Sequence, residues 1–145
     1  MFNKLYKNIH QETFDLTNEI LFSITLDNCV IDHLRLPIPC KQITTFTSTI
    51  RKITVTQNIE CMYCEGSGIE QIICDGPCPN VKTLFLAHNK LIKFTLQLVQ
   101  KPFEVDLTNN DIVEIQYKIP FHFNFKDDGN PIRKMRSDYI NYENY

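Results

Sequence analysis

Alternation of apolar and polar residues is the feature of this chain that most constrains its fold. In several segments every second residue is apolar, which is typical of a β-strand with one buried face. These segments are 20–26, 42–60 (one or two strands), 81–86, 91–99, 103–107 and 113–119. The chain also contains 18 Ile but a single Ala, Ala87. This composition favours strands over helices.

The strand pattern predicts a mainly β fold. No helical segment of adequate length separates the predicted strands, so we expect an antiparallel, sandwich-like β-domain. We find no internal repeat in the sequence. The 145 residues divide into an N-terminal segment at 1–19, a β-domain at 20–132 and a polar tail at 133–145. The N-terminal segment has room for one short helix at 6–16, although its apolar residues fit a helical period poorly.

The overall charge excludes a chain dominated by phosphate-binding residues. There are 15 Lys and Arg against 17 Asp and Glu, which gives a net charge of −2 and a pI of about 6.1. No apolar run approaches the length of a membrane span, and the N-terminus lacks the apolar stretch of a signal peptide. We therefore expect a protein of the cytoplasm or nucleus that does not enter membranes.

Four of the six cysteines lie close together, in the segment 61–80. Cys61, Cys64, Cys74 and Cys78 form two short-spaced pairs with glycine-rich sequence between and within them. Two such pairs, brought face to face by a hairpin, provide the four thiolates that tetrahedral zinc requires. The sequence predicts one structural Zn²⁺ in a hairpin inserted into the β-domain. A site with four protein ligands leaves no position for a catalytic water, so we expect no enzymatic activity.

Three other readings of these cysteines stay open. Two disulfides would require an oxidising compartment. A redox dithiol at Cys61 and Cys64 is disfavoured, because the sequence Glu-Gly-Ser-Gly that follows opposes the usual helix. The third reading is unpaired structural thiols. Cys29 and Cys40 lie on or beside predicted strands, and we expect them to be small core residues.

The segment Cys61-Met62-Tyr63-Cys64-Glu65-Gly66-Ser67-Gly68 has the form CxxCxGxG. This octapeptide resembles the repeated zinc motif of the DnaJ co-chaperones. The order of a strand, a second β-stretch and a cysteine insertion is also similar to the first C-terminal substrate-binding domain of that family. The resemblance extends loosely over residues 19–135. The second repeat is reduced to the stretch from Cys74 to Cys78, and no His-Pro-Asp motif of a J domain is present.

The resemblance implies a zinc-containing domain that binds polypeptides, and it does not carry over stimulation of a heat-shock ATPase. We therefore expect a non-enzymatic, chaperone-like or assembly-factor module whose partner is a polypeptide client or another protein. The alternatives are a zinc-ribbon-like nucleic-acid or transcription accessory factor and a structural subunit of a viral or other large assembly. Binding to nucleic acid is disfavoured, since the tip of the cysteine hairpin carries no Lys or Arg. Formation of a homo-oligomer stays open.

Three further groups of residues admit a binding role. His88 follows the cysteines and could replace one of them as a ligand, although a surface turn is the more ordinary role. The alternating Phe121, Phe123 and Phe125 could stack on nucleic-acid bases, although a core face is favoured. The basic cluster at 133–136 and the tyrosines of the tail, Tyr139, Tyr142 and Tyr145, could contact a partner.

Overall fold

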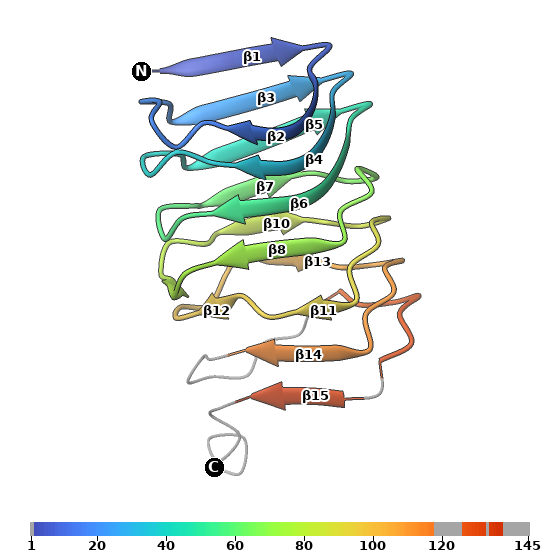
Figure 1. The fold of residues 1–145 in the computed structure, drawn as a ribbon. Helices are drawn as coiled ribbons and strands as arrows, with labels where there is room; N and C mark the ends of the chain where they lie inside the picture. Colours follow the sequence, from blue (N-terminus) through green and yellow to red (C-terminus); the bar gives the residue numbers. More distant parts are fainter. Residues whose placement is uncertain (1, 118–125, 133, 138–145) are drawn as a thin grey trace.

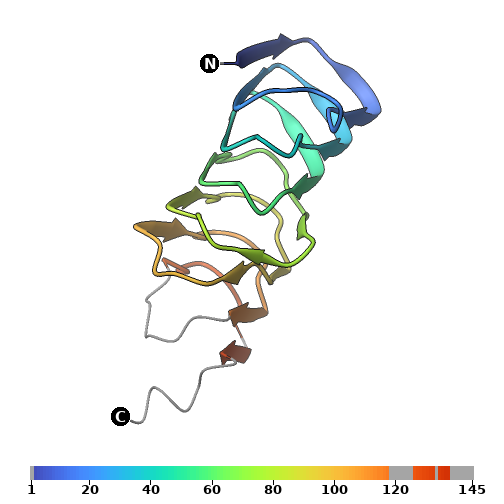
Figure 2. The same cartoon turned by 90° about the vertical axis from the view of Figure 1, so that its left-hand side faces the viewer.

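The chain folds into a parallel β-solenoid, described here from a computed structural model at residues 2–117, 126–132 and 134–137. Each coil contributes one strand to a first sheet, turns sharply, and runs back as a second strand on the opposite side (Figure 1). The coils stack along a single axis, as the view turned by 90° shows (Figure 2). Every strand pair in the described residues is parallel.

The first sheet is continuous through six coils. Its strands, in spatial order, are β1 (Asn3–Lys7), β3 (Ser23–Asp27), β5 (Gln42–Phe46), β7 (Cys61–Tyr63), β10 (Thr83–Phe85) and β13 (Glu104–Asp106). An isolated bridge between Asp106 and Lys126 continues the same side into the next coil.

The second side of the solenoid is divided. One sheet contains β2 (His10–Asp15), β4 (Val30–Arg35), β6 (Thr49–Val55) and β8 (Gln71–Cys74). Another contains β11 (Lys93–Phe94), β14 (Glu114–Tyr117) and β15 (Lys134–Ser137), while β9 (Pro77–Cys78) pairs with β12 (Gln97–Leu98).

The core lies between the two sides and consists of stacked rows of apolar side chains. The parallel register places Ile24 beside Ile43, Ile43 beside Met62 and Met62 beside Leu84, and all four are fully buried. Because neighbouring parallel strands keep the same register, each inward position repeats from coil to coil. Burial of these rows supplies the main stabilising free energy of the fold.

Each coil turns from its first to its second strand through a residue with left-handed backbone geometry. One such residue occurs at the equivalent point of seven coils, with φ between 45° and 77°: Asn8, Asn28, Thr47, Gly66, His88, Asn109 and Gly129. Asn and Gly tolerate this conformation best, which explains their frequency at the turn. The two glycines of the CxGxG stretch are thus turn residues of one coil, with φ of +63° at Gly66 and +67° at Gly68.

A polar or small residue follows six of the seven left-handed turn residues, all except Asn8, and links consecutive coils from inside. This row contains Cys29, Ser48, Ser67, Asn89, Asn110 and Asn130. The Asn110 amide shows its role: its oxygen accepts a hydrogen bond from the Leu91 N–H (3.1 Å), and its nitrogen donates to the Leu86 and Leu107 carbonyls (2.9 and 3.0 Å). The row therefore satisfies buried backbone groups where the strands end.

The first coil covers the end of the core. Tyr6 and Phe14 occupy inward positions and meet edge to face, with ring centroids 4.9 Å apart. Lys4 stands at the position filled by Ile24 in the next coil, and its ammonium lies 4.8 Å from the centre of the Tyr6 ring. In the first described coil, this inward position therefore holds a charged side chain in place of an apolar one.

The structure confirms the mainly β fold and corrects its arrangement. The predicted antiparallel, sandwich-like topology is wrong, because the chain returns after each strand by a second strand and a loop, which serve as the crossover that parallel pairing needs. The prediction that the chain lacks an internal repeat is also wrong. The helix considered at 6–16 is absent, since this segment forms parts of β1 and β2. No helix in the described residues could cross a membrane.

Thr47 is the least favourable of the left-handed turn residues, because it is β-branched. We expect Thr47→Asn to raise the free energy of unfolding by about 0.5–1 kcal/mol, since Asn adopts this conformation at lower cost. Urea unfolding followed by circular dichroism measures the change. Thr44→Asn is the matched control, placed within β5, and should bring no gain. A loss of stability in Thr47→Asn would contradict the assigned turn geometry.

Candidate functional site

The structure does not bring the four predicted zinc ligands together. Cys61 begins β7 and is half-buried, whereas Cys64 is fully buried in the core. Successive side chains of a strand point to opposite faces, so residues three apart, such as Cys61 and Cys64, lie on different faces of the first sheet. A zinc knuckle instead needs a turn that directs both sulfurs to one point. Here β7 is held in the sheet between β5 and β10.

Burial also disfavours the thiolate form of these cysteines. Removal from water raises the pKa of Cys64 to about 12, an effect only partly offset by a hydrogen bond with Thr45. Burial and the neighbouring Cys74 thiol raise the pKa of Cys78 as well. Metal ligation requires thiolates, so both side chains lie in surroundings that oppose it.

Only the second cysteine pair is close. The sulfur atoms of Cys74 and Cys78 lie 3.0 Å apart, at the ends of β8 and β9. In the described part of the chain, no group of three or more His, Cys, Asp or Glu side chains is arranged to hold a metal ion. The four cysteines therefore do not fit a tetrahedral zinc ion in this fold. Zinc binding by these cysteines stays a prediction.

The other cysteines and His88 take structural positions. Cys29 and Cys40 are buried in the core, which confirms the expectation from the sequence. His88 is a turn residue with an exposed ring whose Nε2 lies 3.9 Å from a carboxylate oxygen of Glu65. The phenylalanines at 121–125, Arg133 and the tyrosines Tyr139, Tyr142 and Tyr145 lie outside the described residues.

The feature that departs from the solenoid pattern is an opening in its second side. From β3 to β7 the first-sheet strands begin 19 residues apart, whereas β10 begins 22 residues after β7. The longer coil contains β9 and the segment around Gly76 and Pro77. Within the described residues, β8 pairs with β6 and β11 pairs with β14, and no strand pair links β8 to β11. The same two coils are joined on either side of this stretch, by the bond from the Lys90 N–H to the Ile69 carbonyl and by the pairing of β9 with β12.

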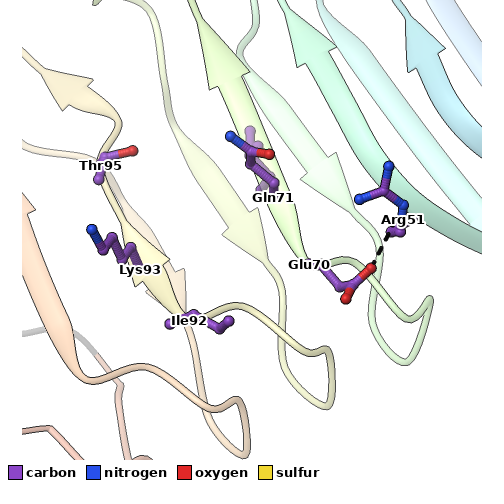
Figure 3. A pocket seen from close by; sticks show the side chains of 7 residues that line it. Arg51, Glu70, Gln71, Ile92, Lys93 and Thr95 are labelled. Atoms are coloured by element: carbon purple, nitrogen blue, oxygen red, sulfur yellow. Dashed lines mark ion pairs between the residues drawn. The ribbon is translucent and has the colours of Figure 1, made fainter.

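A cavity of about 400 Å³ occupies this opening (Figure 3). We call it the inter-sheet groove and define it by its lining residues: Arg51, Glu70, Gln71, Ile72, Ile92, Lys93 and Thr95. These residues come from β6, β8 and β11 or the positions directly beside them. Ile92 is 54% exposed and contributes apolar surface to the groove.

Ion pairs hold the charged side chains on one wall of the inter-sheet groove in place. Arg51 donates two hydrogen bonds to the Asp32 carboxylate (2.5 and 3.0 Å), and its Nε lies 3.8 Å from Glu70. The bonds from Arg51 hold the pKa of Asp32 below its ordinary value. On the other wall, the structure gives Lys93 no ion pair with a described residue. As far as the chain is described, the groove thus offers a cation without an ionic partner beside the apolar surface of Ile92.

The backbone of β8 also faces the groove. The Glu70 N–H donates to the Arg51 carbonyl (2.8 Å) and therefore points toward β6. The Ile69 carbonyl accepts from Lys90 (2.8 Å) in the next coil and points the opposite way. Because peptide groups of successive residues point to alternate edges, the N–H and C=O of Gln71 are directed into the groove. An open strand edge of this kind is a template for pairing with another chain.

Comparison with known proteins does not assign this site. The chain matches no protein-family model, no curated protein and no solved structure. The resemblance of its CxxCxGxG segment to the DnaJ co-chaperones is neither supported nor contradicted by these comparisons and stays a prediction.

Proposed function

We propose that this protein is a non-enzymatic protein-binding module that takes an extended segment of a partner polypeptide into the inter-sheet groove. The single observation that carries the proposal is the open backbone edge of β8 beside a cavity of about 400 Å³. An added peptide strand would pair with the backbone of Gln71, and its side chains would supply specificity.

The lining side chains indicate what the segment contains. A strand laid beside β8 presents alternate residues to one face, where Ile72 and Ile92 provide apolar contact. The ammonium of Lys93 favours a carboxylate at a neighbouring position of the segment. We therefore expect an extended sequence with alternating apolar residues and at least one Asp or Glu, as in a chaperone client or an assembly partner.

The charges of the outer surface support a protein partner over nucleic acid. Along the second side, the signs alternate in the order Asp32, Arg51 and Glu70. On the first sheet, Glu60 lies between Lys41 and Lys82, with Nζ–carboxylate distances of 3.7 and 2.8 Å. In these rows, the positive and negative side chains neutralise each other. They do not provide the continuous series of basic residues that binding to a phosphate backbone requires.

Peptide selection tests the proposal. We expect a library of random 12-residue peptides to yield binders with the alternating apolar and acidic pattern, and their binding to shift the amide resonances of Gln71 and Lys93. Gln71→Pro removes the N–H at the open edge and should weaken binding at least about tenfold, since a peptide–backbone hydrogen bond is lost and the edge is blocked. Calorimetric titration measures both affinities.

Gln71→Ala is the matched control, because it removes the side chain and keeps the N–H. It should bind the selected peptides nearly as tightly as the wild type, and both variants should unfold at about the wild-type temperature. Equal binding by Gln71→Pro and Gln71→Ala, or resonance shifts confined to other surfaces, would overturn the groove as the binding site.

A further inference from the structure

Cys74 and Cys78 form the single thiol–thiol contact within the described residues. Their sulfur atoms are 3.0 Å apart, and a disulfide needs about 2.05 Å, so closure requires an approach of about 1 Å. The other buried thiols have different neighbours: the sulfurs of Cys29 and Cys40 donate to backbone carbonyls at 3.4 Å, those of Asp27 and Gln42.

The segment between the two cysteines holds them in this arrangement. Gly76 has a φ of +108°, which favours glycine, and its N–H donates to the Cys74 carbonyl (3.0 Å). Pro77 then begins β9, where Cys78 is paired beside Leu98 of β12. The two sulfurs are therefore brought together by a tight turn whose ends are fixed in two different strand pairs.

The two thiols differ in access to solvent. Cys74 is half-buried, and Asp75 and Gly76 beside it are exposed to similar or greater degrees, whereas Cys78 is fully buried. An incoming reagent therefore reaches Cys74 first, and Cys78 is placed behind it. This order, an accessible thiol backed by a second thiol in contact, is the arrangement required for disulfide exchange.

We propose that Cys74 and Cys78 are a reversible disulfide site that reacts with small-molecule disulfides such as oxidised glutathione. The Cys74 thiolate attacks one sulfur of the reagent, forming a mixed disulfide and releasing one glutathione thiolate. Cys78 is protonated before the second step, because burial raises its pKa. Its sulfur loses that proton as it attacks the Cys74 sulfur, the intramolecular disulfide forms, and the second glutathione leaves and takes up a proton. Overall, two protein thiols are oxidised, one glutathione disulfide is reduced to two glutathione thiols, and proton transfers to and from water balance the charges.

This modification site goes beyond the proposed binding function and does not depend on it. The disulfide would close a ring from Cys74 to Cys78 and tie the end of β8 to β9. Reduction by excess glutathione reverses both steps, so the state of the site follows the ratio of oxidised to reduced glutathione.

The test equilibrates the full chain in buffers of graded glutathione ratio, quenches it with acid, and locates disulfides by mass spectrometry of alkylated peptides. We expect a Cys74–Cys78 disulfide in the wild type and, as a matched control, in Cys61→Ser. Cys78→Ser should instead accumulate glutathione on Cys74, and Cys74→Ser should show neither product. The equilibrium constant for forming the disulfide should be at least about tenfold larger in folded protein than in the same protein in guanidinium chloride.

Any of three results would overturn the proposal. One is alkylation of both Cys74 and Cys78 at glutathione ratios that oxidise the unfolded chain. Another is oxidation through a different pair, shown by loss of the disulfide in Cys61→Ser. A disulfide that forms equally well in folded and unfolded protein would also contradict it, because the fold would then contribute nothing to the site.

Discussion

Replacing Asn89 by alanine is expected to lower the free energy of unfolding by about 4 kcal/mol. The Asn89 amide oxygen accepts hydrogen bonds from the backbone N–H groups of Ser67 (2.9 Å) and Ile69 (3.0 Å). Its nitrogen donates to the carbonyls of Cys64 (2.8 Å) and Leu86 (3.0 Å). Alanine would leave two buried N–H groups and the Cys64 carbonyl without partners, whereas the Leu86 carbonyl would keep its bond from Asn110. Each unsatisfied group costs about 1–3 kcal/mol before relaxation.

The position of Asn89 explains why the effect should be large. It joins two consecutive coils in the middle of the described stack, so its loss weakens the contact between neighbouring repeats on which solenoid stability depends. Urea unfolding should show the lower stability, and thermal unfolding should shift downward by roughly 10 °C.

Asn58→Ala is the matched control for this experiment. Asn58 also donates a side-chain hydrogen bond to a backbone carbonyl, that of Ile38 (2.8 Å), but at the surface. We expect its removal to cost less than about 1 kcal/mol. If the two variants were equally stable, Asn89 could not be a buried link between coils.

The second large effect is expected from Leu84→Ala, which should lower the free energy of unfolding by about 3 kcal/mol. Leu84 is fully buried and lies between Met62 and Val105 in the register of the first sheet. Shortening a side chain at such a position removes apolar contacts and leaves a cavity. Chemical denaturation of the purified variant measures the loss.

The adjacent Phe85 supplies the control. It belongs to the same strand but faces outward, where its ring stacks obliquely on Tyr63 with centroids 5.5 Å apart. We expect Phe85→Ala to cost about 1 kcal/mol despite the larger side chain removed, because the ring is only half-buried. If Phe85→Ala lowered the free energy of unfolding more than Leu84→Ala did, the assignment of Leu84 to the inner face and Phe85 to the outer face of β10 would be wrong.

The sequence was sufficient to locate most strands but not to arrange them. Alternation correctly identified Ile24 and Leu26 as buried, because a strand with one buried face produces that pattern in any sheet. Alternation also predicted that Phe103 is buried, but its side chain is 86% exposed. The alternating apolar series begins at Phe103, one residue before β13 starts. Alternation contains no information about strand direction. The parallel arrangement could be predicted only by recognising that the coils repeat along the sequence.

The repeat was difficult to recognise because its signature positions vary. The residue after the left-handed turn is Cys29, Ser48 and Ser67 in three coils and asparagine in the next three, all small or polar enough to bond the backbone. Only 84–91 and 105–112 show the full order apolar-x-apolar-x-x-Asn-x-apolar. A search for spacings of 19 to 22 residues between left-handed turn positions could have found the coils.

The fold explains why the cysteine spacing resembles a zinc motif. Cys64 occupies the inward position held by Leu26 and Thr45 in the preceding coils, and Gly66 occupies the turn position. The CxxCxG order therefore coincides with the ordinary positions of a coil. No sequence rule indicated the inter-sheet groove. The groove forms where consecutive coils differ in length, and this difference is visible only once the coils are known.

Nuclear Overhauser effects between backbone protons test the parallel solenoid most directly. In a parallel sheet, the Ile43 strand should show contacts to the Ile24 and Met62 strands in the same residue order, without close pairs of Hα protons. Strong Hα–Hα effects between these strands, in opposite residue order, would show antiparallel pairing and contradict both the stacked coils and the groove between β8 and β11.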